Sequence, residues 1–353
     1  MTDTLIVGAG LAGASAALHL SKHRAVHLLE TAHPAAGASG AAAGLVNPLM
    51  GRRARAVWHR EAALEALHHT LALARATPLL RTGGVVRPAR DAKQATRFAE
   101  AAEADPAHAC WLSAEAAQAR YPGVEAPHGA LHVLQGGALD VSAFTEALVQ
   151  AAQAQGATVE LGQTLTAWGE SDGHAFAEVR DPEGALRRVT ARRLLLAIGW
   201  GYRAHPTLAG LALHGIKGQT IRLHRPPGLD ELPILSGTGY IVPSGDLLVV
   251  GSSYEHTFAD LRPSAAHAEA LRAQAARMVP ALADAPVAYA TAGVRVTVPT
   301  TRLPLVGPVP GHSCCWVFTG LSSKGLLLGP YLAGQLHEFF QRPDTIFPEV
   351  QVR

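Results

Sequence analysis

The sequence predicts an α/β protein of two domains, and three observations support this fold class. The chain has 353 residues, more than one typical core accommodates. It opens on the apolar run Leu5-Ile6-Val7, followed by glycines and an alanine-rich stretch, which is typical of a buried strand, a turn and a helix. Strand patterns dominate residues 218–251, so a second, strand-rich part is expected after the first.

The first thirty residues carry the most specific motif. Gly8 allows a tight turn after the first strand, Gly10 lets the backbone approach a pyrophosphate, and Gly13 lets helix and strand pack closely. Glu30 ends a second apolar run about 20 residues later and can accept hydrogen bonds from a ribose diol. The start of the helix adds unpaired N–H groups and partial positive charge for phosphates. The motif predicts a Rossmann-type dinucleotide site rather than an ordinary glycine-rich turn.

Residues 31–48 are rich in glycine and other small residues. Such a backbone can lie flat against a ligand. The alternative is a flexible linker, but a linker would be more polar than the run Ala41–Val46. We therefore expect a second ligand-contacting segment here.

The remaining elements follow from periodicity and turn residues. Helices are predicted over residues 55–75, 89–120, 140–155, 263–282 and 326–340. Strands are predicted over residues 83–88, 129–134, 156–161, 175–180, 186–190, 193–199, 218–223, 239–243, 247–251 and 315–318. The last strand, the turn Gly320–Gly325 and the final helix repeat the strand–glycine–helix order of the N-terminus, so this helix start can face the same ligand.

Composition narrows the class of protein. Thirty basic and twenty-eight acidic residues leave a net charge of +2, which gives no electrostatic reason to expect nucleic acid or membrane binding. The uncharged run 303–323 contains three prolines and is not expected to span a membrane. Cys110, Cys314 and Cys315 lack metal or disulfide spacing. With no signal peptide before the first strand, a cytoplasmic protein without a metal site is expected.

Several segments, taken in order, resemble one family. They are Val7–Gly13 with Glu30, Gly37–Gly44, Leu196–Gly199, Lys217–Gln219, Gly239–Asp246, Gly293–Arg295, Leu303–Gly307 and Gly320–Pro330. Together they make the chain similar to the FAD-dependent glycine oxidase and D-amino-acid oxidase family. The chain also resembles the FAD oxidase domain of the tRNA 5-methylaminomethyl-uridine biosynthesis enzyme.

The resemblance implies a glutathione-reductase-like flavoprotein architecture. A discontinuous Rossmann-type FAD-binding domain would comprise residues 1–82, 136–214 and 288–353, and an antiparallel-sheet (α+β) substrate domain residues 83–135 and 215–287. The cofactor contacts that it implies are Gly8, Gly10, Leu11, Ala12, Gly13, Glu30, Thr31, Ala38, Ser39, Ala43, Gly44, Leu45, Leu165, Gly199, Gly320, Leu321, Ser322, Ser323, Lys324, Gly325 and Leu326. Covalent-flavin relatives use a cysteine near the substrate arginine. None lies between Cys110 and Cys314, so noncovalent FAD is expected.

For the substrate, the resemblance implies Arg295 as the group that binds the carboxylate and Tyr240 as a hydrogen-bonding partner of the same carboxylate. A guanidinium fork suits bidentate carboxylate recognition. The alternatives are an ion-paired surface arginine and a tyrosine packed at the domain interface. The family pattern has a proline after the arginine and an acid before Leu303, whereas this chain has Val296 and Thr300-Thr301, so its pocket can differ from that of glycine oxidases.

The reaction implied is oxidative deamination of a small amino acid: a D-amino acid, glycine or an N-substituted glycine. Hydride passes to flavin N5, the imino acid hydrolyses to keto acid and ammonia, and O2 accepts the electrons to give H2O2. One alternative is a tRNA carboxymethylaminomethyl-uridine oxidase, for which the basic cluster Arg52, Arg53, Arg55 and Arg60 could contact RNA. The other interpretation of this cluster is that its members are solvated or that one of them lines the pocket mouth. Another is a dehydrogenase with a different electron acceptor. Oligomeric state stays open.

Overall fold

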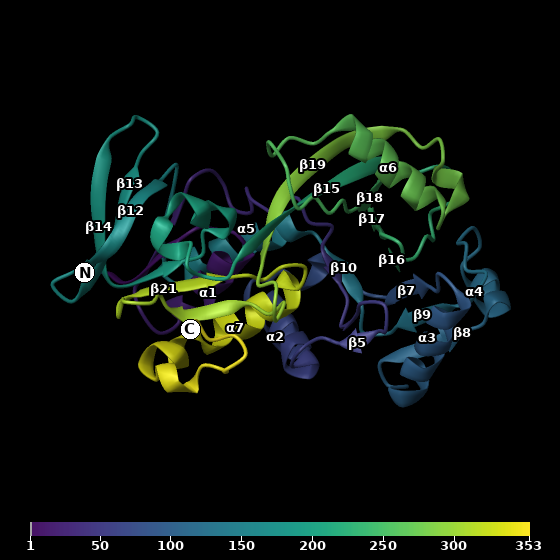
Figure 1. The fold of residues 1–353 in the computed structure, drawn as a ribbon, viewed down its shortest axis with the longest axis horizontal. Coiled ribbons are helices and arrows are strands. Elements are labelled where there is room, and N and C mark those ends of the chain that lie inside the picture. Colours follow the sequence, from purple (N-terminus) through teal and green to yellow (C-terminus); the bar gives the residue numbers. More distant parts are fainter. Residues whose placement is uncertain (1) are drawn as a thin grey trace.

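The computed structural model describes residues 2–353 and divides them between two large sheets (Figure 1). The first sheet has the order β11-β2-β1-β14-β13-β12, with β21 on β14 and β20 on β21. Its strands are β1 (Thr2–Val7), β2 (Val26–Glu30), β11 (Thr158–Leu161), β12 (Thr164–Ser171), β13 (His174–Arg180), β14 (Leu186–Leu196), β20 (Leu305–Pro308) and β21 (Cys315–Thr319). The pairs among β11, β2, β1, β14 and β21 are parallel, and those of β12, β13 and β20 are antiparallel.

Four helices pack over one face of this sheet: α1 (Leu11–Ser21), α2 (Arg60–Leu73), α5 (Val141–Ala154) and α7 (Gly325–Gln341). Every other residue of the parallel strands enters their core, as Ile6, Leu28 and Leu195 do, because side chains alternate along a strand. Leu5, Leu29 and Leu194 point to the opposite face, where a second apolar cluster forms. Burial on both faces explains the continuous apolar runs of β1, β2 and the end of β14.

The second sheet has the order β19-β15-β18-β17-β16-β7-β9-β8 and is antiparallel except for the pair β16–β7. Its strands are β7 (Val85–Pro88), β8 (Ala109–Leu112), β9 (Ala130–Val133), β15 (His214–His224), β16 (Leu235–Ser236), β17 (Tyr240–Ser244), β18 (Leu247–Gly251) and β19 (Val287–Thr297). Helix α6 (Ala265–Ala276) packs on one face through Leu271 and Ala275, in one cluster with Ala117 of α4 (Ala114–Arg120). Phe98 of α3 (Ala92–Ala104) belongs to the cluster on the other face.

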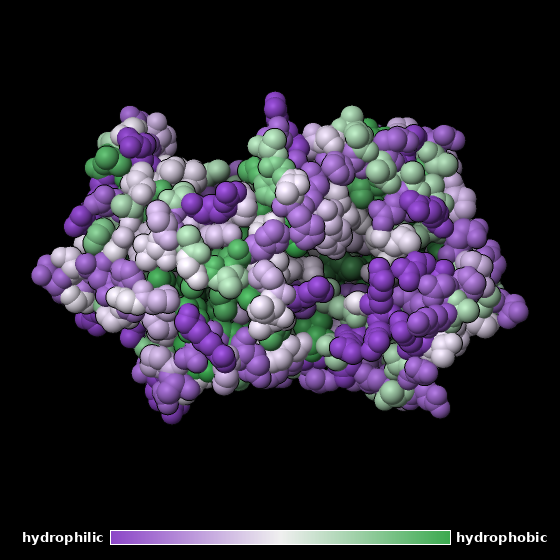
Figure 2. Space-filling view, viewed as in Figure 1, coloured by the Kyte–Doolittle hydropathy of each residue, from purple (hydrophilic) through white to green (hydrophobic). Residues whose placement is uncertain are grey.

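Short elements connect the two large sheets. β3 (Leu45–Val46), β10 (Gly137–Leu139) and β6 (Leu80–Arg81) form a three-stranded sheet, and β4 (Leu49–Met50) pairs with β5 (Arg55–Ala56). The 3-10 turns are η1 (Thr77–Leu79), η2 (Gly199–Ala204), η3 (Pro206–Leu208), η4 (Pro280–Leu282) and η5 (Pro343–Thr345). Figure 2 shows hydrophobic side chains in a hollow near the middle of the molecule, where β10 and β16 lie in Figure 1. None of the helices in residues 2–353 is long and apolar enough to cross a membrane.

One strand differs from the predicted domain boundaries. Residues 288–297 were expected in the FAD-binding domain, but they form most of β19, which pairs with β15 from His214–Thr297 to Leu223–Val287. The pairing places this segment at the edge of the second sheet. The rest of the proposed division stays a prediction.

Candidate active site

The start of helix α1 offers backbone donors without side-chain competition. Gly8 has φ +101°, a left-handed conformation that favours glycine, and a Cβ there would lie 2.5 Å from the carbonyl oxygen of Ala197. Gly10 is the N-cap and provides no side-chain cap. In residues 2–353, no hydrogen bond engages the N–H groups of Ala12 and Gly13. These donors, together with the helix dipole, fit a phosphate ligand.

Close packing behind this turn depends on Gly13. A Cβ on Gly13 would overlap the carbonyl oxygen of Gly8 and lie 3.0 Å from its carbonyl carbon. A Cβ on Gly10 would meet only the hydroxyl of Ser39, at 3.4 Å. Gly13 therefore allows the helix to pack closely against the end of the strand. Gly10 leaves open space above the turn, as a pyrophosphate requires.

Glu30 lies at the end of β2, next to the turn. Its carboxylate accepts the N–H of Ala9 at 2.6 Å and that of Ala32 at 3.1 Å, so it is held beside the glycine turn. The backbone N–H of Gln163 donates to the carbonyl of Glu30 at 2.9 Å, and the hydroxyl of Thr31 faces the carbonyl of Gln163 at 3.5 Å. Glu30 and Thr31 therefore lie together beside the glycine turn, and their predicted contact with the ribose of the cofactor stays a prediction.

Two other predicted contact residues lie on the first sheet. Leu165 is half-buried in β12, two residues after Gln163, beside a register shift between Leu165 and Ala167. Gly199 is exposed and starts η2, just after β14 ends. Leu165 thus lies two residues from Gln163, whose carbonyl faces the hydroxyl of Thr31. Gly199 follows the end of β14, which packs against Gly8 through Ala197.

The small-residue segment 37–44 lies against both sheets. The hydroxyl of Ser39 accepts the N–H of Leu11 at 3.0 Å, which ties the segment to the start of α1. A Cβ on Gly293 of β19 would lie 2.8 Å from the Cα of Ala38, and Thr220 of β15 donates to the carbonyl of Ala41 at 3.2 Å.

The segment ends at Gly44, which has φ +72°, and a Cβ there would overlap the backbone of Leu139. Ala43 and Leu45 flank this residue and are half-buried. The segment thus connects the nucleotide turn to the second sheet, and its close contacts leave no room for a side chain at Gly44 or, on the facing strand, at Gly293.

The start of α7 lies beside the start of α1. A Cβ on Gly325 would lie 3.0 Å from the side chain of Leu11, so the two helix starts are neighbours. The turn before α7 contains Gly320 at φ +74° and Ser322 at φ +51°. No hydrogen bond within residues 2–353 engages the N–H groups of Gly325 and Leu326.

The side chains of this turn leave the helix start open. Lys324 donates its Nζ to the carbonyl of Arg302 at 2.7 Å, and burial, followed by repulsion from Arg302, lowers the pKa of this amine. Leu321 and Ser322 are half-buried, and Ser323 is exposed. The free N–H groups of α7 therefore offer a second set of donors beside α1, suited to a group on which negative charge develops.

Arg295 lies on β19 and reaches across β15. Its Nη2 donates to the hydroxyl of Ser252 at 3.1 Å and to the carbonyl of Ser253 at 2.9 Å, and its guanidinium stacks 4.5 Å from the ring centre of Tyr254. A Cβ on Gly218 would lie 2.8 Å from Cζ, so this glycine makes room for the group. All of these partners are neutral, which leaves the positive charge available for an anion.

Tyr240 of β17 meets Arg295 at the same place. A Cβ on Gly251 would lie 2.6 Å from the phenol oxygen, and Ser252 follows directly in the chain. Burial raises the pKa of Tyr240, and this effect exceeds the opposing effects of Arg295 and of a hydrogen bond with Ser252. The phenol is therefore protonated at neutral pH and can donate a hydrogen bond to a carboxylate held by Arg295.

Residues around this arginine were not identified from the sequence. Gly218 belongs to Lys217–Gln219, one of the segments that resemble the family, but only the strand register shows that it lies under the guanidinium of Arg295. Ser252, Ser253 and Tyr254 follow a strand that has no polar signature. The members of the basic cluster differ in their surroundings. Arg52, Arg53 and Arg55 are exposed, whereas Arg60 forms ion pairs with Asp105 and Glu61.

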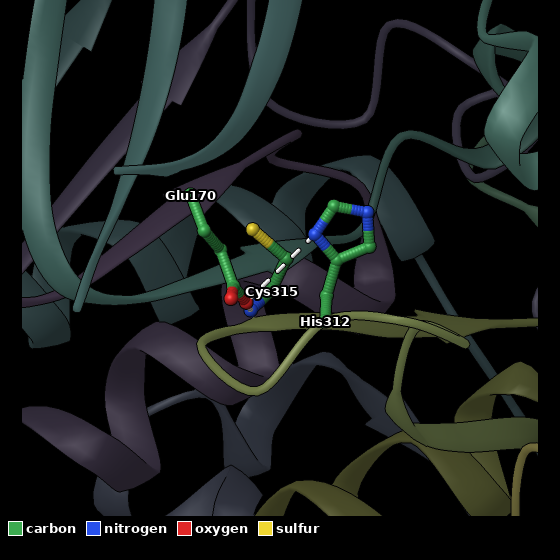
Figure 3. Close-up of side chains that lie close together, drawn as sticks. All are labelled: Glu170, His312 and Cys315. Carbon is green, nitrogen blue, oxygen red and sulfur yellow. Dashed lines mark hydrogen bonds and ion pairs between the residues drawn. The ribbon is translucent and has the colours of Figure 1, made fainter. Parts of the chain in front are cut away.

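A separate group of potential metal ligands lies at the start of β21, the end of this strand that is farther from α7 in the chain. Figure 3 shows its three side chains. Side-chain atoms of Glu170, His312 and Cys315 lie within 4.8 Å of one another. The Glu170 carboxylate accepts the N–H groups of Cys314 and Cys315, the latter at 2.8 Å, and the Cys315 thiol donates to a backbone carbonyl. Burial, followed by the nearby Glu170, raises the pKa of Cys315 to about 12, which keeps the thiol protonated. The group therefore acts as a hydrogen-bonded clamp on the turn before β21.

The parallel sheet, the glycine turn, the acid at the end of β2 and the second helix start are typical of the class of dinucleotide-binding α/β proteins, here joined to a second, mostly antiparallel sheet. A family model described as FAD dependent oxidoreductase (DAO) matches residues 3–338. The chain belongs to this family of FAD-dependent enzymes, and its cofactor is FAD.

Three comparisons give the range of similarity. A glycine oxidase from Pseudomonas aeruginosa is 37% identical over 165 residues, 45% of this chain and 43% of that protein. The tRNA 5-methylaminomethyl-2-thiouridine biosynthesis bifunctional protein MnmC from Thiobacillus denitrificans is 32% identical over 359 residues, 93% of this chain and 55% of that protein. The chain thus spans about half the length of these curated relatives. The crystal structure of glycine oxidase from Geobacillus kaustophilus has the same fold, with a TM-score of 0.85 at 24% identity, and covers 98% of this chain and 96% of that chain.

Proposed function

We propose that the chain oxidises a small amino acid with FAD. The observation that supports this most strongly is the meeting of Arg295 and Tyr240 over Gly218 and Gly251, next to the segment that links the nucleotide turn to the second sheet. A guanidinium with neutral partners and a protonated phenol form a carboxylate site. The family relationship supplies the chemistry, since bound FAD accepts a hydride.

Each part of the site has a role in this proposal. The N–H groups at the start of α1 and the Glu30 carboxylate hold the pyrophosphate and ribose of FAD. The start of α7 stabilises the negative charge of the reduced cofactor. Arg295 exchanges its hydrogen bonds with Ser252 and Ser253 for the substrate carboxylate, and this fixes the position of the α-carbon. The product is an imino acid, which hydrolyses to a keto acid and ammonia, or to a keto acid and an amine where the nitrogen carries a substituent. O2 is the proposed acceptor of the two electrons and is reduced to H2O2.

The test is steady-state kinetics of Arg295→Gln with glycine, sarcosine, D-proline and D-alanine. We expect KM to rise by about 100-fold, since a charge-assisted carboxylate contact is lost, while flavin content per chain stays at the wild-type level. Arg272→Gln is the matched control, because Arg272 lies on α6 and pairs with Glu269. An unchanged KM in the Arg295 variant would contradict the proposal, as would an anaerobic flavin spectrum that none of these amino acids bleaches.

A second candidate function is oxidation of the N-carboxymethyl amine of a modified uridine in tRNA. The 32% identity to the MnmC protein over 93% of this chain favours it. Retention of tRNA by the purified chain, decreasing steeply with salt, would support this candidate. Equal retention of tRNA by the Arg52→Gln/Arg53→Gln variant would exclude the exposed arginines as its binding surface.

A further inference from the structure

The side of the second sheet that carries Arg295 also carries a second guanidinium, that of Arg222. Side chains alternate along a strand, so residues 216, 218, 220 and 222 of β15 share one face. Arg295 pairs with Ile216 and lies on this face. Tyr240 also lies there, because it pairs with Gly251, which in turn pairs with Thr220.

The two guanidinium groups extend toward each other over the middle of β15. Arg295 lies above Gly218, and Arg222 turns back so that its Nη1 donates to the hydroxyl of Thr220 at 2.9 Å. Positions two apart on a strand are separated by about 6.6 Å. Gly218 and Thr220 are two positions apart on β15, so one small molecule with two carboxylates can extend from one guanidinium to the other.

Neither arginine forms an ion pair with an acidic residue in the described chain, 2–353. The partners of Arg222 are the hydroxyl of Thr220 and the ring of Tyr289, whose centre is 5.6 Å from Cζ. Tyr240 lies within the electrostatic influence of both guanidinium groups. Two half-buried guanidinium groups without an acidic partner therefore lie on one face of this sheet, an arrangement that favours an anionic ligand.

We propose that Arg222 binds a second carboxylate and that the preferred substrate is a small amino acid with two carboxylates. The second carboxylate can be carried on the amine nitrogen, as in N-carboxymethyl glycine, or on the side chain of an acidic D-amino acid. This inference rests on the proposed function, since it takes Arg295 as the partner of the first carboxylate.

Binding of non-oxidisable ligands tests the subsite without turnover. The FAD-loaded protein is titrated with succinate and with propionate, and the flavin absorbance change gives each Kd. Succinate should bind at least ten-fold more tightly, and Arg222→Gln should remove this preference while leaving propionate binding unchanged. Arg222→Lys, which keeps the charge, should retain part of the preference, and Arg272→Gln should retain all of it. Equal affinities in the wild type, or an unchanged preference in Arg222→Gln, would overturn the proposal.

Turnover distinguishes the two positions of the second carboxylate. Iminodiacetate is compared with sarcosine, and D-aspartate with D-alanine, by anaerobic flavin bleaching and by kcat/KM. Arg222→Gln should lower kcat/KM for the preferred diacid by ten- to hundred-fold and for its monoacid partner by less than about three-fold. If monoacids are oxidised normally and no diacid is preferred, the proposed role of Arg222 is wrong and the proposed function stands. Bleaching by none of these compounds, with succinate binding still dependent on Arg222, overturns the proposed function alone.

Discussion

Gly218→Ala tests whether the position of the Arg295 guanidinium controls activity. A Cβ at position 218 would overlap Nη2 and lie 2.8 Å from Cζ, whereas ordinary contacts begin at 3.4 Å. The guanidinium must therefore retreat by on the order of 1 Å and lose its contacts with Ser252 and Ser253. Because the displaced atoms are the end of a flexible side chain, the fold should tolerate the change.

We expect kcat/KM for the preferred amino acid to fall by about 100-fold, the effect of a 1 Å misplacement in an active site. Flavin content and the melting temperature should stay close to wild type. The assay is peroxide release under steady-state conditions, with flavin absorbance measured on the same sample. Gly210→Ala is the control, since a Cβ there meets no atom within 4 Å. Wild-type kinetics in Gly218→Ala would refute the reasoning, and so would loss of FAD.

Three further predictions concern the scaffold. Gly13→Ala should destabilise the protein by about 3 kcal/mol, measured by denaturant unfolding, because its Cβ meets the backbone of Gly8, which cannot move aside. Glu170→Gln should lower the free energy of unfolding by about 1.5–3 kcal/mol at neutral pH, because charge-assisted hydrogen bonds are lost. Burial raises the pKa of Glu170, but the larger combined effect of its hydrogen bonds to the turn lowers the pKa below the ordinary value of 4.5. The stability difference between wild type and variant should therefore narrow as pH falls below 4.5. Burial, together with neighbouring basic groups, lowers the pKa of His19 from 6.5 to about 4. The melting temperature of the wild type should therefore fall more than that of His19→Gln as pH is lowered from 6.5 to about 4, and the difference between the two proteins should stay constant above pH 6.5.

Controls separate these effects from general damage. Gly37→Ala, where a Cβ meets no atom within 4 Å, should unfold like the wild type and serves as the control for Gly13→Ala. An unchanged stability gap for Glu170→Gln at low pH would show that its charge does not stabilise the turn. A wild type and a His19→Gln variant with parallel pH profiles would show that His19 is protonated equally in both states.

The sequence predicted the parts of the molecule that depend on local patterns. The glycine turn, Glu30 and the final strand–glycine–helix unit were located to within a few residues, because glycines and apolar runs mark them directly. The family fold was predicted and is confirmed. The single helix predicted over residues 89–120 was wrong: helices α3 and α4 flank the strand β8, which was missed because the surrounding segment is rich in alanine, a strong helix former. Strand β12 was also missed, since its polar and apolar residues alternate only weakly. The predicted strands 186–190 and 193–199 proved to be the single strand β14, which runs from Leu186 to Leu196.

The substrate side was less predictable because its geometry arises from strand register. Arg295 was singled out through the family resemblance, but nothing in its neighbours indicates that it reaches over Gly218 or contacts Ser252. The relation of Arg222 to Arg295 depends on an antiparallel pairing between residues about 70 positions apart. Side-chain roles at the cofactor turn and at the arginines stay predictions that the variants above can test.

The contact between segment 37–44 and the second sheet limits how this enzyme can change its substrate. Ala38 fits against Gly293, and the carbonyl of Ala41 is bound by Thr220, so the segment proposed to contact the cofactor is in direct contact with the strands that carry the proposed substrate site. If the proposed site is correct, a shift of β15 or β19 that enlarges the substrate pocket would also displace segment 37–44, which is proposed to contact FAD. New specificities should therefore arise by exchange of side chains around the proposed substrate site, such as Arg222 and Tyr254, while strands β15 and β19 keep their positions.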